Sequence, residues 1–196
     1  MNIKHFGNIV KCAAAVMAAV FFTGLLITLN RYEAQTEVIQ EVSDELTYFK
    51  NFTLYGIDGE QITQDDLKGY KVTVFNAWAP WCVPCVGEMP YLEKLSNEYH
   101  DKGIQVVGVV ADYYPAHAGK SDGYDDSIRE IEEQIGVTYP IVVADEAFHS
   151  VPYVMLNSAV PGTWAVDENG NLIEFFSGDR SEEEWRECFD KWLEGR

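Results

Sequence analysis

Cys82 and Cys85 stand two residues apart in the stretch WAPWCVPCVGE, which spans residues 78–88. A pair with this spacing can be half of a metal site, a short structural disulfide, or a couple that cycles between dithiol and disulfide. Glu88 follows Cys85 by three residues, which places both on one face if the segment is helical. A carboxylate near a thiol normally raises the pKa of that thiol, so the acid requires a chemical explanation.

The spacing of the other candidate ligands argues against a metal site. A zinc site needs two more ligands, and no two of the remaining candidates are spaced as a second ligand pair. These candidates are His100, His117, His149 and Cys188. A structural disulfide that encloses two residues removes little entropy from the unfolded chain. A redox couple is therefore the favoured interpretation, and no bound metal is expected.

The residues around the pair indicate how it is positioned. The run KVTVFNAW (71–78) is almost continuously apolar, which is typical of a strand buried on both faces. A helix that begins at Val83 places both sulfurs at its N-terminus, where the partial positive charge favours a thiolate. Pro84 is tolerated in its first turn. We expect Cys82 to be the exposed, attacking sulfur and Cys85 to be the more buried thiol that resolves the mixed disulfide.

The rest of the chain alternates strand and helix patterns. Asp58-Gly59 and Asn169-Gly170 predict hairpin turns, and Thr63 and Ser181 are expected helix N-caps. The expected strands lie at 71–78, 104–112 and 139–145, and the expected helices at 83–103, 125–136 and 181–195. This order predicts an α/β fold with a central mixed sheet flanked by helices and an N-terminal β-hairpin extension. The irregular stretch 113–124 is long enough to suggest a functional loop.

The N-terminal segment has the features of a signal anchor. Residues 12–29 are eighteen residues without a charged side chain, the lower limit for crossing a bilayer. Lys4 and Lys11 precede them, which places the N-terminus in the cytoplasm and the remainder of the chain outside. A cleaved signal peptide is the alternative, although no convincing small-residue cleavage site follows the apolar run.

These features divide the chain into three parts. We expect residues 1–31 to form the cytoplasmic N-terminus and membrane helix, 32–47 a linker and 48–196 the folded domain. The chain carries 14 Lys and Arg against 32 Asp and Glu, a formal charge of −18. No basic cluster follows the N-terminal segment, so a nucleic-acid-binding role is disfavoured, because phosphate contacts require Lys and Arg.

The sequence FNAWAPWCVPCVGEMP resembles that of the TlpA/ResA-like thiol–disulfide oxidoreductases, which are membrane-tethered proteins with a thioredoxin-like fold. The resemblance extends from about Tyr48 to Leu193 and includes AVPGTWAVDENGNLI. It implies that Cys82, Cys85 and Glu88 are the catalytic residues and that the two cysteines form the redox disulfide. It implies no cofactor, because the dithiol itself carries the electrons.

The resemblance also implies how a client protein binds. Val160-Pro161 matches the family's cis-proline position, which faces the cysteines and binds the partner's extended chain. Trp81 and Pro84 are expected to line the same substrate site. Gly162-Thr163 replaces the Thr-Thr that often follows this proline, which leaves the substrate contacts there open.

Glu88 is expected to move a proton. Ordinary thioredoxins carry a buried Asp six residues before the first cysteine, and this chain has Asn76 there. Glu88 could replace that acid from the helix, with a raised pKa, and accept the proton of Cys85 as this thiol attacks. The alternative is an exposed first-turn acid that favours the helix dipole.

The resemblance favours a reductant of oxidised extracytoplasmic client proteins, as in cytochrome c maturation or repair of oxidised proteins. Its electrons would come from a membrane thiol-electron transporter of the CcdA type. A disulfide-forming oxidant and a copper or zinc metallochaperone are the alternatives. Cys188 is expected to be a buried core thiol on the last helix.

Overall fold

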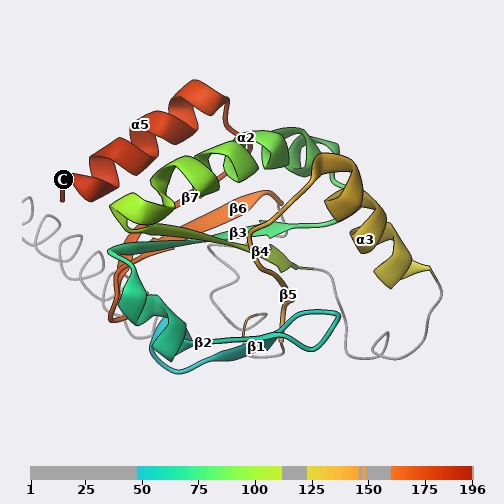
Figure 1. The fold of residues 1–196 in the computed structure, drawn as a ribbon, viewed down its shortest axis with the longest axis horizontal. Coiled ribbons are helices and arrows are strands. Elements are labelled where there is room, and N and C mark those ends of the chain that lie inside the picture. The colour runs from blue at the N-terminus through green and yellow to red at the C-terminus, as the bar shows by residue number, and fades with distance from the viewer. Residues whose placement is uncertain (1–47, 112–122, 146–147, 149–159, 196) are drawn as a thin grey trace, which may run out of the picture. The chain divides into compact units, whose positions relative to one another are not determined.

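The computed structural model describes residues 48–111, 123–145, 148 and 160–195 (Figure 1). The strands are β1 Thr53–Tyr55, β2 Gln61–Thr63, β3 Val72–Trp78, β4 Ile104–Val110, β5 Ile141–Val143, β6 Gly162–Val166 and β7 Leu172–Ser177. The α-helices are α2 Val83–Tyr99, α3 Tyr124–Ile135 and α5 Glu182–Leu193, and the 3₁₀ helices are η1 Tyr48–Lys50, η2 Gln64–Gly69 and η3 His100–Lys102.

The strands form one mixed sheet in the order β2-β1-β5-β4-β3-β6-β7. Strands β3, β4 and β5 are parallel to one another, and the remaining pairs are antiparallel. The predicted central mixed sheet, with hairpins on both sides of the strand–helix alternation, is therefore confirmed. Strand β3 lies near the middle of the sheet and leads directly to the cysteine pair at the start of α2.

The two faces of the central strands bury different clusters. Every residue of β3 and of β4 is buried, as expected for strands covered on both sides. Val74 and Val106 face the cluster that contains the apolar residues of α2, α3 and α5. Phe75 and Val107 face a second cluster, to which η1, η2 and the N-terminal hairpin contribute.

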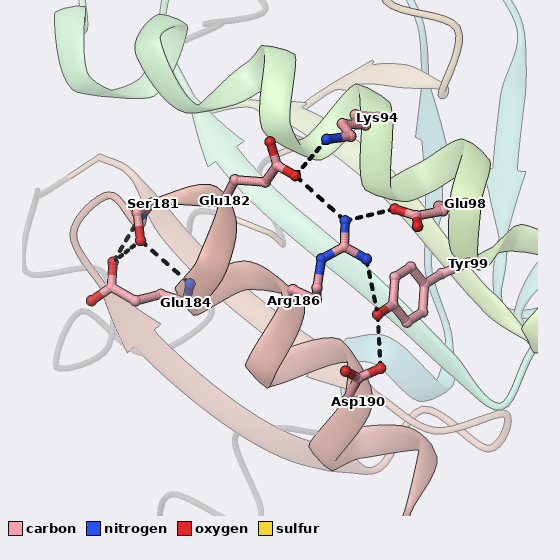
Figure 2. A network of polar contacts seen from close by, with 8 residues as sticks. All are labelled: Lys94, Glu98, Tyr99, Ser181, Glu182, Glu184, Arg186 and Asp190. Atoms are coloured by element: carbon pink, nitrogen blue, oxygen red, sulfur yellow. Dashed lines mark hydrogen bonds and ion pairs between the residues drawn. The ribbon is translucent and has the colours of Figure 1, made fainter.

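The helix caps follow the sequence signals. Thr63 accepts from Asp65 N at 3.2 Å, and Asp66 accepts in return from the Thr63 backbone, so η2 begins with a capping box. Ser181 forms the second box with Glu184 at the start of α5 (Figure 2). Strand β5 is shorter than predicted from 139–145, because only Ile141–Val143 pairs with its neighbours.

Helices α2 and α5 lie side by side and are joined by polar contacts centred on Arg186 (Figures 1 and 2). The Arg186 guanidinium donates to Glu98 at 2.7 Å and to the Tyr99 hydroxyl at 3.4 Å. Tyr99 in turn donates to Asp190 at 2.7 Å. Below these contacts the buried aromatic residues of α5 pack into the core, so the register of α5 on α2 is fixed by both kinds of interaction.

Several predictions concern parts of the chain outside the described residues. The predicted membrane helix and linker lie within 1–47, and almost all of the predicted functional loop lies within 112–122. Among the helices of residues 48–111, 123–145 and 160–195, none combines the length and apolar character needed to cross a bilayer.

Gly170 offers a test of the packing between the β6–β7 hairpin and η1. Its φ is 75°, and a Cβ at this position would collide with the carbonyl oxygen of Phe49. Gly136 has a similar φ of 77° but open space around it. We expect Gly136→Ala to cost about 1 kcal/mol through its backbone conformation alone, and Gly170→Ala about 3 kcal/mol because the collision is added.

Denaturant unfolding of the two variants measures this difference. Equal losses of unfolding free energy would show that Gly170 is not held against Phe49.

Candidate active site

The two cysteines form a disulfide at the N-terminus of α2. Cys82 is the N-cap residue, and its sulfur accepts a hydrogen bond from the backbone N–H of Cys85 at 3.3 Å. Pro84 occupies the first turn, where no helical N–H is lost. A thiolate on Cys82 would gain from this N–H and from the helix dipole, which is the condition for a low-pKa nucleophile.

Cys82 is less accessible than the sequence suggested. Its exposed fraction is 4%, against 0% for Cys85, so the predicted order holds but the prediction of an exposed sulfur is wrong. The physical reason is the chain segment before β6, where the Val160 carbonyl oxygen lies 3.5 Å from Cys82 Sγ. Trp81 and Val83 beside it are 65% and 81% exposed.

The Val160–Pro161 peptide bond is cis, the geometry that the family resemblance implies for this position. Pro161 itself is buried, and its carbonyl accepts from Gly178 N at 2.9 Å. The contact between Cys82 Sγ and the Val160 oxygen places this segment directly against the redox pair. In the dithiol form, the Cys82 S–H could donate to this carbonyl.

Glu88 lies three residues after Cys85 on α2 and is buried, with an exposed fraction of 1%. Its Oε1 accepts from Asn76 Nδ2 at 2.9 Å, and its Oε2 accepts from Arg180 N at 3.0 Å and from Trp185 Nε1 at 3.1 Å. The alternative of an exposed first-turn acid is therefore wrong. The carboxyl group instead links α2 to β3 and to α5.

Burial raises the pKa of Glu88 to about 7. The loss of hydration is the largest cause, and the nearby carboxylate of Asp179 acts in the same direction. The hydrogen bonds from Asn76, Arg180 and Trp185 favour the charged form and limit the rise. The group therefore changes its charge near neutral pH, where a proton acceptor is most effective.

The sequence did not predict two hydrogen-bond partners of this acid, Arg180 and Trp185, or Thr163, which orients its third partner Asn76. Asn76 Nδ2 also donates to Thr163 Oγ1 at 3.2 Å, so Thr163 orients the amide that faces Glu88. Arg180 and Trp185 reach Glu88 across 92 and 97 positions. Only Thr163 had a local signal in the sequence, because Gly162-Thr163 departs from the family pattern; Arg180 and Trp185 had none.

The structure describes two of the four remaining candidate ligands, His100 and Cys188. His100 contacts the Tyr70 hydroxyl at 3.0 Å. Cys188 is a free, half-buried thiol packed against the core, less buried than predicted, and its pKa is raised by burial. His117 and His149 lie outside the described residues.

The raised pKa of Glu88 predicts a pH-dependent stability. Because the folded state binds this proton more tightly than the unfolded state does, the stabilisation is complete below about pH 4.5 and is lost as the pH rises through about 7. Relative to Glu88→Gln, the wild-type unfolding free energy should therefore fall by about 3 kcal/mol over this range.

Urea unfolding of both oxidised proteins at several pH values measures this difference. Glu184→Gln is the control, because its capping bonds lower the pKa of Glu184, so its contribution is lost only as the pH falls below about 4.5 and does not decline as the pH rises through about 7. Parallel curves for wild type and Glu88→Gln would contradict the predicted proton binding.

Comparison with known proteins agrees with the fold and the cysteine pair. The Redoxin family model matches residues 42–188. The thioredoxin-like protein YneN of Bacillus subtilis is 33% identical over 140 residues, which cover 71% of this chain and 75% of the relative. The thiol-disulfide oxidoreductase ResA of the same organism is 27% identical over 169 residues, covering 82% and 85%.

Among solved structures, the thiol:disulfide interchange protein of Chlorobium tepidum has the same fold. It superposes with a TM-score of 0.61 at 20% identity, over 74% of this chain and 94% of that protein. Together with the redox-type cysteine pair at a helix N-terminus, these similarities identify the chemistry. The chain belongs to the Redoxin family and is a thioredoxin-like thiol–disulfide oxidoreductase of the TlpA/ResA-like group.

Proposed function

We propose that this protein reduces disulfides in client proteins outside the cytoplasm, with Cys82 and Cys85 as the redox couple. The observation that carries the proposal is the position of the disulfide at the start of α2, where Cys82 Sγ accepts the N–H of Cys85. This hydrogen bond stabilises a thiolate on Cys82, the species that attacks a client disulfide.

The exchange proceeds in two steps. The Cys82 thiolate attacks one sulfur of the client disulfide, which forms a mixed disulfide and releases the first client thiolate. Cys85 then attacks Cys82 Sγ, which forms the Cys82–Cys85 disulfide and releases the second client thiolate. The client gains two electrons, and the protein is oxidised to the disulfide form seen in the structure.

Glu88 is the proton acceptor for the second step. Cys85 is completely buried and must lose its proton before it can attack, and Glu88 is a buried group with a pKa of about 7 three residues further along α2. Its carboxylate takes the Cys85 proton during the attack and returns a proton when the couple is reduced again.

The client chain binds against the segment that contains Val160 and Pro161. Cys82 Sγ lies 3.5 Å from the Val160 oxygen, so a client sulfur that bonds to Cys82 has to approach past this segment. The exposed side chains of Trp81 and Pro84 supply the remainder of the contact surface. Apolar surface of this kind suits an unfolded or extended client.

The N-terminal segment holds the domain at the outer face of the membrane, as the apolar stretch 12–29 and its basic flank indicate. A membrane thiol-electron transporter returns the couple to the dithiol. The clients are oxidised proteins such as apocytochromes c or oxidatively damaged proteins. The similarity to ResA, a thiol-disulfide oxidoreductase, supports the redox role in this assignment.

Trapping the mixed disulfide tests the mechanism. In a Cys85→Ser variant the first step occurs and the second cannot, so clients should accumulate as disulfide-linked adducts of Cys82. The adducts should disappear on reduction and should be absent from Cys82→Ser/Cys85→Ser, whereas Cys188→Ser should not alter them. Adducts that persist without Cys82 would contradict the assignment of the nucleophile.

The redox state in the cell tests the direction. A reductant supplied with electrons should be held largely as the dithiol, and acid quenching followed by thiol alkylation measures this fraction. We expect most Cys82 and Cys85 to be alkylated, and the disulfide to accumulate when the membrane electron supply is removed. A protein that is mainly disulfide-bonded in growing cells would instead be an oxidant.

A further inference from the structure

Trp185 connects the C-terminal helix to the redox site. It lies in the first turns of α5, it is completely buried, and its indole N–H donates to Glu88 Oε2 at 3.1 Å. The same oxygen accepts the backbone N–H of Arg180 at 3.0 Å. Among the described residues, two of the three hydrogen-bond donors to Glu88 therefore come from residues 180–185.

The two oxygens of Glu88 are not equivalent. Oε2 already accepts two hydrogen bonds, and neither Trp185 Nε1 nor a backbone N–H can accept one. From the described part of the chain, Oε1 accepts one hydrogen bond, from Asn76 Nδ2. A proton on Oε2 would have to displace one of its donors, whereas a proton on Oε1 leaves all three donors in place.

The orientation of Asn76 supports this difference. Its amide nitrogen donates to both Glu88 Oε1 and Thr163 Oγ1, so the nitrogen and not the oxygen of the amide faces the acid. The geometry points to the following assignment, which rests on the proposed role of Glu88. Trp185 is a positioning residue of the redox site: with Arg180 N, it holds Oε2 as an acceptor, so that the proton from Cys85 is carried on Oε1.

Helix α5 is held firmly enough for this task. Glu182 accepts from Lys94 at 2.6 Å, and Arg186 bonds to Glu98 and Tyr99 (Figure 2). Glu182 precedes Trp185 in α5 and Arg186 follows it, so the helix is tied to α2 on both sides of the tryptophan. The Trp185 ring also packs on Phe176, with ring centroids 5.3 Å apart. The indole therefore cannot turn away from Glu88 without losing its packing on Phe176.

Few charged groups face Glu88 from the surrounding elements. Asp179 raises its pKa, and Tyr139, which precedes β5, stays neutral because its own pKa is raised by burial and by nearby acids that include Glu88. The guanidinium of Arg180 lies over the Phe176 ring at 3.6 Å, and it is the backbone N–H of Arg180 that bonds to the acid. From β3 and β6 the acid meets the uncharged Asn76 and its partner Thr163.

Carbon-13 NMR of the Glu88 carboxyl in the oxidised protein tests the assignment. Trp185→Phe keeps an aromatic ring but removes the donor, and we expect the pKa of Glu88 to rise by about one unit. Trp192→Phe is the matched control, because Trp192 is also buried on α5 but donates to Glu174 at 2.7 Å. Equal Glu88 titrations in the two variants would overturn the assignment.

The indole N–H resonance of Trp185 in the wild-type protein provides a second test, which does not depend on a variant that folds. With the proton on Oε1, this resonance should shift with an apparent pKa near that of Glu88, yet stay in the downfield, hydrogen-bonded range at both ends of the titration. Movement to the position of an unbonded indole at low pH would place the proton on Oε2 and overturn the assignment.

Both measurements use the disulfide form and require no turnover, so they separate this assignment from the proposed function. If Glu88→Gln exchanges disulfides as fast as wild type, the proton-transfer role of Glu88 fails, while a Trp185-dependent titration of the acid would still stand. If Glu88→Gln exchanges disulfides more slowly than wild type but the pKa of Glu88 is unchanged in Trp185→Phe, the proposed function stands and the positioning role of Trp185 fails.

Discussion

A carboxyl group with almost no contact with water has to obtain its hydrogen bonds from the protein, and Glu88 imposes this requirement on the whole domain. Its donors come from the central strand β3, from the turn after β7 and from the C-terminal helix. These elements must therefore meet at the Glu88 carboxyl group. The long-range packing of the fold and the chemistry of the cysteine pair therefore depend on the same buried acid.

The placement of this acid explains why a stable core can contain it. Three hydrogen bonds offset part of the free-energy cost of burying the charged carboxylate. The part that is not offset raises the pKa of Glu88 to about 7. A fully solvated glutamate would remain ionised near neutral pH and could not bind and release a proton there. The acid is thus destabilising at high pH, which is the usual consequence of tuning a group for proton transfer.

Much of the fold could be predicted because its signals are local. The turn pairs, the helix caps at Thr63 and Ser181 and the apolar strands depend on residues close together in the chain, and the structure contains all of them. The cysteine pair and the burial of Glu88 were predicted from the motif and the missing acid at Asn76. The partial exposure of Cys188 was not predicted, because the helical spacing of residues does not define how closely a neighbouring element covers a side chain.

What could not be predicted depends on contacts between distant segments. The segment at Val160-Pro161 was expected to face the cysteines, but the shielding of Cys82 by the Val160 carbonyl, 78 positions away, was not predicted, because a backbone oxygen leaves no signature in the sequence. Trp185 had the spacing of an ordinary core residue on an amphipathic helix, and only the packing of α5 on α2 brings its indole to Glu88. Local patterns predict the face that a helix buries, but not the polar atom that this face meets.

The central claim is that Glu88 accepts the Cys85 proton. The rate at which Cys85 attacks the mixed disulfide on Cys82 tests this claim directly. When the dithiol reacts with an aromatic disulfide reagent, Cys82 releases one chromophoric thiolate and Cys85 releases the second. If Glu88 is the acceptor, the second phase in wild type should accelerate through an inflection near pH 7 and should be about a hundredfold slower at that pH in Glu88→Gln. Identical rates and pH profiles for the two proteins would contradict the claim.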